Sequence, residues 1–70
     1  MSEVRSHVTG TVWKVEVAVG DPVQVGDELV IMESMKMEIP VEAEVAGTVT
    51  AILCAEGDAV DEGAPVVTVE

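Results

Sequence analysis

The chain has 70 residues, enough for one small domain, because a chain of this size buries roughly 60% of its unfolded surface. Sixteen valines and a single aromatic residue, Trp13, favour β-structure over helix. Fourteen acidic residues against three Lys and Arg give a net charge of −11, which repels phosphate backbones and anionic lipid and excludes nucleic acid and membrane surfaces as partners.

The predicted elements are short strands separated by turn residues. In the first half they are an opening strand over 4–8, a partly alternating strand over 11–17, a turn at 20–22, a short strand and turn over 23–27, and an apolar strand over 28–33. The second half repeats this order with strands over 39–45 and 48–54, a turn at 57–58, a short strand near Val60 and a last strand over 65–70. Six to eight short strands with no convincing helix predict an all-β fold, a flattened antiparallel barrel or sandwich. No linker is visible, so residues 1–70 are expected to form one domain.

An internal repeat divides the chain into two halves. Shifting the sequence by 37 positions gives twelve identities among 33 aligned pairs, including Gly10/Gly47, Gly20/Gly57 and Asp21/Asp58. Residues 1–33 and 38–70 are therefore two copies of one structural unit, and we expect two quasi-symmetric four-strand halves. Four residues have no counterpart in either copy: Ser34, Met35, Lys36 and Met37.

These four residues must reverse the chain between the last strand of the first copy and the first strand of the second. They include no Gly, Asn, Asp or Pro, although the central residues of a two-residue hairpin usually need positive φ. If Met35 and Lys36 are central, each costs on the order of 1 kcal/mol in backbone strain. Unfavourable turn chemistry of this kind is expected at functional sites.

Lys36 would then be a protruding amine between two flexible, exposed methionines. Exposed apolar surface costs about 25 cal/mol per Å² unless a partner or an attached group covers it. On the residues alone, an ordinary solvated lysine beside methionines that fill core gaps is the alternative. Met32 is expected in the core, because the repeat pairs it with Val69.

The segment E-S-M-K-M-E-I-P, residues 33–40, resembles the attachment motif of biotinyl domains, in which a lysine between methionines lies at the turn joining two halves. The resemblance covers the whole chain, including A-G-T-V at 46–49 and E-G-D at 56–58, and is greatest to free-standing biotin attachment proteins. It implies a non-catalytic carrier, a monomer with biotin covalently attached to Lys36 and with Met35 and Met37 beside it.

The resemblance also implies the partners. A biotin protein ligase would attach biotin, and the carrier would move carboxylate from a biotin carboxylase to a carboxyltransferase. Glu33, Ser34 and Glu38 would belong to the surface that the ligase recognises, although solvated charges are an equally good interpretation of the two glutamates. Ser34 departs from the alanine that is common in the family at this position.

Three alternative functions fit the sequence less well than a biotin carrier. A lipoyl carrier shares the fold, but its usual motif has an aspartate where this chain has Met35. Calcium binding by Asp58, Asp61 and Glu62 lacks the spacing of a recognisable calcium loop, so no metal site is expected. One histidine and one cysteine cannot supply a catalytic set.

The remaining side chains of interest are interpreted as structural or surface residues. Cys54 lies in an apolar run without a cationic neighbour, which indicates a small buried hydrophobe rather than a reactive thiol. His7 and Trp13 carry no site role. No run reaches the roughly 18 apolar residues of a membrane span and the first residues lack a signal-peptide layout, so the protein is expected in the cytoplasm.

Overall fold

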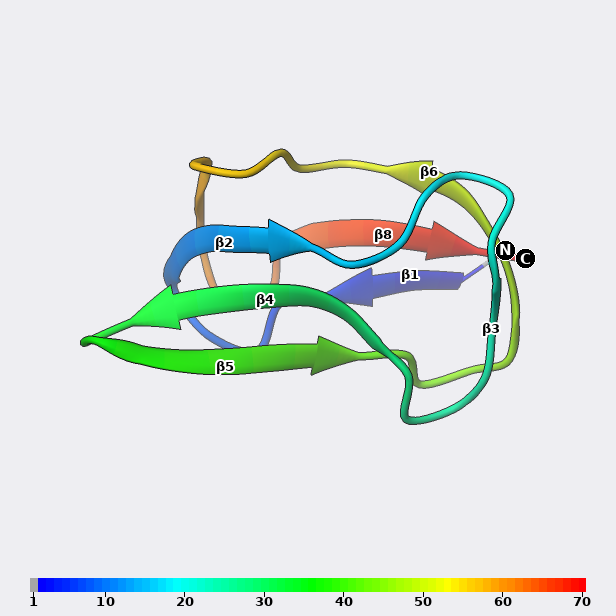
Figure 1. Ribbon diagram of the computed structural model, residues 1–70, viewed down its shortest axis with the longest axis horizontal. Helices are drawn as coiled ribbons and strands as arrows, with labels where there is room; N and C mark the ends of the chain where they lie inside the picture. Colours follow the sequence, from blue (N-terminus) through cyan, green and yellow to red (C-terminus); the bar gives the residue numbers. More distant parts are fainter. Residues whose placement is uncertain (1) are drawn as a thin grey trace.

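The computed structural model describes residues 2–70, which form eight strands (Figure 1). In chain order they are β1 (Ser2–Arg5), β2 (Gly10–Val15), β3 (Pro22–Val23), β4 (Glu28–Ser34), β5 (Met37–Glu42), β6 (Gly47–Ile52), β7 (Ala59–Val60) and β8 (Pro65–Val69). The described part of the chain is all-β, as the valine-rich composition predicts. Among residues 2–70 there is accordingly no helix of the length and apolarity needed to span a membrane.

The strands form two four-stranded antiparallel sheets, and each sheet takes strands from both copies of the repeat. One sheet has the order β1-β8-β6-β3 and the other the order β5-β4-β2-β7. A shift of 37 residues along the chain, forward or backward, converts each strand of the first sheet into a strand of the second. Strands β1, β8, β6 and β3 correspond in this way to β5, β4, β2 and β7. The quasi-symmetric four-strand halves are therefore confirmed, but they interleave, so neither half forms a sheet by itself.

The symmetry extends to single hydrogen bonds between the halves. The Val12 amide donates to the Asp58 carbonyl oxygen at 2.8 Å, and its counterpart, the Val49 amide, donates to the Asp21 carbonyl oxygen at 2.9 Å. The side chains of both aspartates also close their own turns by accepting a bond from the backbone amide three residues earlier. The turn of one copy is therefore anchored on a strand of the other copy, so the two copies need each other to fold.

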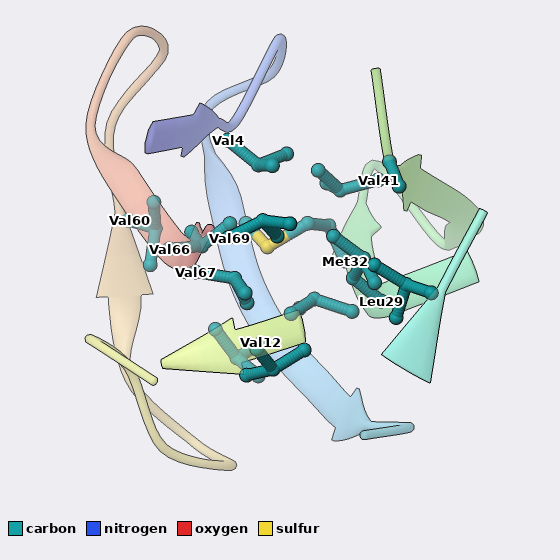
Figure 2. Packing of buried hydrophobic residues seen from close by; sticks show 13 residues of the cluster. Val4, Val12, Leu29, Met32, Val41, Val60, Val66, Val67 and Val69 are labelled. Carbon is teal, nitrogen blue, oxygen red and sulfur yellow. The ribbon is translucent and has the colours of Figure 1, made fainter. Parts of the chain in front are cut away.

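The core lies between the two sheets and is built largely from valine (Figure 2). Its fully buried members include Leu29 and Met32 on β4 and Val66, Val67 and Val69 on β8. Met32 has no exposed surface, which confirms its predicted place in the core. Burying a side chain of this size stabilises the fold by roughly 1.5–3 kcal/mol, so this cluster holds β4, and hence the hairpin that β4 begins, in place.

Four predicted strands end earlier than expected. Those over 11–17 and 48–54 stop at Val15 and Ile52, and the opening strand of each copy ends three residues early. The strands predicted over 4–8 and 39–45 stop at Arg5 and Glu42. In both copies the next residue turns to the other half: the Ser6 amide donates to Ala64, and the Ala43 amide donates to Asp27. Both residues are buried, so the apolar pattern continues after sheet pairing has ended.

The hairpin of β4 and β5 forms one end of an elongated molecule with extents of 31 × 18 × 18 Å (Figure 1). At the opposite end β1 begins beside the end of β8, with Ser2 paired to Val69. Under the repeat this junction corresponds to the hairpin turn. The tip is therefore the one place along the described chain where the two copies are joined covalently.

Candidate functional site

The tip of the β4–β5 hairpin is a two-residue turn. Ser34 and Met37 form the last strand pair, and Met35 and Lys36 occupy the central positions. Their φ angles are 52° and 65°, the only positive values among the non-glycine residues 2–70. Positive φ at both central positions is the signature of a type I′ turn, which matches the twist of the flanking strands. The predicted strained turn is therefore present, at a cost of about 1 kcal/mol for each non-glycine residue.

The side chains at this tip are presented to solvent. Met35 is 91% exposed and Met37 is 62% exposed, whereas Met32, further along β4, is fully buried. Lys36 is exposed between them, and among residues 2–70 no carboxylate lies within 4.0 Å of its Nζ. By strand alternation Ser34 and Met37 face the same side as the core, yet Met37 is open to solvent. The end of the hairpin therefore projects beyond the two packed sheets.

Glu33 and Glu38 lie directly opposite each other at the base of the tip. Both are exposed, and across residues 2–70 neither makes an ion pair within 4.0 Å. Like charges directly opposite one another weaken a strand pair. The hairpin thus carries its lysine above two unneutralised carboxylates on its outer face, and Ser34 is half-buried beside them.

Gly10 supports the tip from β2 and was not singled out from the sequence. A Cβ at this position would clash with the carbonyl oxygen of Glu33 and would lie 3.3 Å from the Ser34 Cβ. Gly47 makes the equivalent approach to the carbonyl oxygen of Glu70. The repeat pairing of these two glycines was the available signal, because a glycine kept in both copies marks either a turn or a close backbone approach.

Replacing Met35 with asparagine is expected to stabilise the fold. Asparagine tolerates the left-handed region better than methionine, and the exposed Met35 side chain loses little packing, so the free energy of unfolding should rise by about 0.5 kcal/mol. Urea unfolding followed by circular dichroism measures this change. Met37→Asn is the matched control, since Met37 lies in a strand and asparagine is unfavourable there. Equal stability of both variants would show that the turn is not strained.

Cys54 is half-buried and packs against the core, as predicted. Its Sγ lies 3.8 Å from the Val66 carbonyl oxygen. Burial, with a smaller effect from the Asp58 carboxylate, raises the pKa of the Cys54 thiol above its usual 9.0. This supports the interpretation of Cys54 as a structural residue.

The raised pKa of Cys54 predicts two pH effects. Iodoacetamide should alkylate the folded protein more slowly at pH 8 than the urea-unfolded chain, because less thiolate is present in the folded protein.

Above pH 9 the unfolded chain releases the thiol proton while the folded chain retains it, so the free energy of unfolding should fall as pH rises from about 9. Urea midpoints at pH 8 and pH 10, compared with those of Cys54→Ala, isolate this contribution. Equal alkylation rates of the folded and unfolded chains would contradict it.

The other side chains singled out from the sequence lie away from the tip. Trp13 is half-exposed at the shift in register between β2 and β4, and its repeat partner Thr50 is at the equivalent shift between β6 and β8. A bulge residue at a symmetric position has a structural explanation. His7 lines a shallow open groove of about 420 Å³ with residues 25–26 and 42–44, and none of the tip residues line it.

Asp58, Asp61 and Glu62, the three residues considered for calcium binding, differ in their surroundings. The Oδ2 atom of Asp58 accepts a hydrogen bond from the Ala55 amide at 2.9 Å, and this bond closes the turn before β7. Asp61 and Glu62 are exposed in the following turn. Within residues 2–70 no three His, Cys, Asp or Glu side chains converge in a way that could hold a metal ion.

Curated proteins resemble this chain over most of its length. The chain is 47% identical over 60 residues to the biotin/lipoyl attachment protein of Bacillus subtilis, a match that covers 86% of this chain and 82% of that protein. It is 43% identical to the biotin carboxyl carrier protein of acetyl-CoA carboxylase of Haemophilus influenzae, covering 96% of this chain and 48% of that protein.

The fold has a solved counterpart in a much larger protein. The Kluyveromyces lactis urea carboxylase superposes with a TM-score of 0.93 and 40% sequence identity, over 99% of this chain and 6% of that chain. The all-β fold of two four-stranded sheets is therefore one that a urea carboxylase also contains. Residues 1–69 match the model of the Biotin-requiring enzyme family, which covers biotin and lipoyl domains. The chain belongs to this family.

Proposed function

We propose that this protein is a biotin carrier and that Lys36 is its attachment residue. The observation that supports this most strongly is the position of Lys36 in a type I′ turn at one end of the molecule, in a chain whose family is that of biotin-requiring enzymes. The neutral Lys36 amine would attack the acyl carbon of biotinyl-adenylate held by a biotin protein ligase, forming an amide as the bond to AMP breaks, AMP leaves and the amine loses a proton. One positive charge is lost in that step, which takes the formal charge of −11 to −12.

The residues at the tip fit such a covalent group. The amine is exposed, and in the described part of the chain no carboxylate restrains it within 4.0 Å. An amine must be neutral to attack an acyl carbon, and the tip offers no adjacent imidazole or thiol to take its proton. The base must therefore come from the ligase, and the task of this chain is to present the amine in a fixed place.

The core and the neighbouring strand β2 fix the position of the hairpin tip that carries the Lys36 amine. The buried residues of β4 anchor one strand of the hairpin, and the close approach of Gly10 to Glu33 holds its end against β2. The two-residue turn leaves little freedom at the base of the Lys36 side chain. The attached group then moves on a flexible side chain from a rigid base, which confines it to a short range and raises its effective concentration at partner sites.

We assign the surrounding residues as follows. Met35 and Met37 form an apolar surface on both sides of the amine that the ligase covers. Glu33 and Glu38, with Ser34 between Glu33 and the turn, form the rest of the recognition surface. An uncompensated carboxylate pair costs stability in the free protein, and a basic group on a partner would relieve that cost.

The carrier itself is proposed to be non-catalytic and monomeric. Biotin, when bound, supplies a ureido nitrogen that accepts a carboxyl group and gives it up again. Relatives occur in carboxylases acting on acetyl-CoA and urea, and biotin carboxylase and carboxyltransferase active sites are the partners that this chemistry requires. The chain spans about half of the first of these relatives and a small fraction of the second.

Reconstitution with a biotin protein ligase, biotin and ATP tests this function. We expect the intact mass to increase by one biotinyl group, streptavidin to retain the product, and peptide mapping to place the group on Lys36. Parallel reactions with a lipoate ligase test the lipoyl alternative. A chain that accepts lipoyl but not biotinyl, or that accepts neither, would refute the proposal.

A further inference from the structure

The tip carries two methionines whose exposure serves no folding purpose. Met35 is 91% exposed and Met37 is 62% exposed, while Met32 on the same hairpin is fully buried. Thioethers in a core are shielded from solutes, whereas exposed thioethers are open to oxidation. The structure therefore places two oxidisable sulfurs on either side of Lys36 and a protected one within the same hairpin.

We propose that Met35 and Met37 are sites of reversible oxidation that control whether Lys36 can be modified. The inference rests on the proposed function, since it concerns access of the ligase to Lys36. In each step a peroxide transfers one oxygen atom to the methionine sulfur: the O–O bond breaks, an S=O bond forms, the sulfur loses two electrons, and the peroxide is reduced to water or an alcohol. The product is a polar, chiral sulfoxide in place of an apolar thioether.

The chemical change acts directly on the recognition surface. A partner that covers Met35 and Met37 meets two apolar side chains in the reduced protein and two sulfoxide oxygens in the oxidised one. These sulfoxides would have to lose their hydration when the partner binds, next to the amine that must react. We expect the ligation rate to fall about tenfold for each sulfoxide, equivalent to about 1.4 kcal/mol each.

The fold is expected to survive the oxidation. Neither methionine belongs to the buried core, and both side chains are already largely hydrated. Oxidation of Met32, which lies between the two sheets, would by contrast disrupt packing (Figure 2). The modification therefore changes the reactivity of the tip without unfolding the protein.

Peroxide treatment of the biotin-free protein tests the proposal. After a short exposure to hydrogen peroxide and quenching with catalase, peptide mass mapping should show that Met35 and Met37 gain oxygen at least about tenfold faster than Met32. The melting temperature should be unchanged, and the rate of biotinylation should be lower. Treatment with both methionine sulfoxide reductases, one for each sulfoxide epimer, should restore that rate.

The Met35→Leu/Met37→Leu double variant is the matched control, with each protein compared with itself before and after peroxide. It retains Cys54 and Met32, so an effect of peroxide on either residue would persist in it. We expect its ligation rate to be insensitive to peroxide. Equal oxidation of Met32, Met35 and Met37, or equal ligation of oxidised and reduced wild type, would overturn the inference. Absence of biotinylation in the untreated wild type would refute the proposed function instead.

Discussion

Lys36→Ala is expected to abolish biotin attachment while leaving the fold intact. The side chain is exposed at the tip and forms no ion pair within the described residues, so its removal takes no packing from the core. The change in the free energy of unfolding should be within about 0.5 kcal/mol, the usual range for a surface substitution. Streptavidin capture should fall to background, because the other lysine, Lys14, lies in β2 rather than in a turn, and urea unfolding should give the wild-type midpoint.

Two control variants sharpen this result. Lys14→Ala removes the only other lysine, which lies in β2 with its Nζ 3.4 Å from Glu16, and it should be biotinylated like wild type. Lys36→Arg keeps a positive charge at the tip but has no amine that the ligase can acylate, so it should also be unmodified. Streptavidin capture of Lys36→Ala, or its failure to fold, would show that the attachment residue has been assigned incorrectly.

Gly10→Ala is expected to cause the largest loss of stability of the changes considered. A single methyl group at this position meets the Glu33 carbonyl oxygen, which is backbone and cannot rotate away. The chain must shift β2 away from β4 next to the tip, at a cost of about 3 kcal/mol. For a domain of this size that loss corresponds to a melting temperature roughly 12–24 °C lower. The rate of ligation at Lys36 should fall as well, because Glu33 moves.

Gly20→Ala separates this steric effect from backbone strain. Gly20 has a φ of 97°, and a Cβ there would meet no atom within 4 Å, so only its conformational cost of about 1 kcal/mol remains. The Gly20 amide donates to the Val49 carbonyl oxygen of β6, in the sheet that does not contain the hairpin, so ligation of this variant should follow its folded fraction. Thermal unfolding of both variants makes the comparison. Equal losses would contradict the close approach of Gly10 to β4.

Much of the architecture could be predicted from the sequence because the repeat is so strong. The pairs Gly20/Gly57 and Asp21/Asp58 mark equivalent turns, and the structure gives them equivalent hydrogen bonds. The alternating valines predict strands, since a period of two gives each strand one buried face. Strand ends were less well predicted. Ser6 and Ala43 are buried like strand residues, although their amides bond to loops of the other half.

The candidate site could be predicted because residues 34–37 are the four residues that belong to neither copy of the repeat. They include none of the residue types that usually form a two-residue turn. That placed Lys36 and its methionines at a turn, and the structure confirms the positive φ angles of Met35 and Lys36. The support from Gly10 was not predicted, because its contact is with a strand more than twenty residues away. The roles of Glu33, Ser34 and Glu38 in ligase recognition remain predictions.

By itself, the sequence determined the all-β class, the two copies, the buried Met32 and the surplus segment with its lysine, because these depend on local periodicity and on comparison of the chain with itself. Only the tertiary structure decided how the copies interleave, how far the tip projects, and how much of each methionine side chain meets solvent. Met32, Met35 and Met37 differ little in local chemistry. Their exposure, from fully buried to 91%, depends on where the two packed sheets end, and the packing of distant strands sets that boundary.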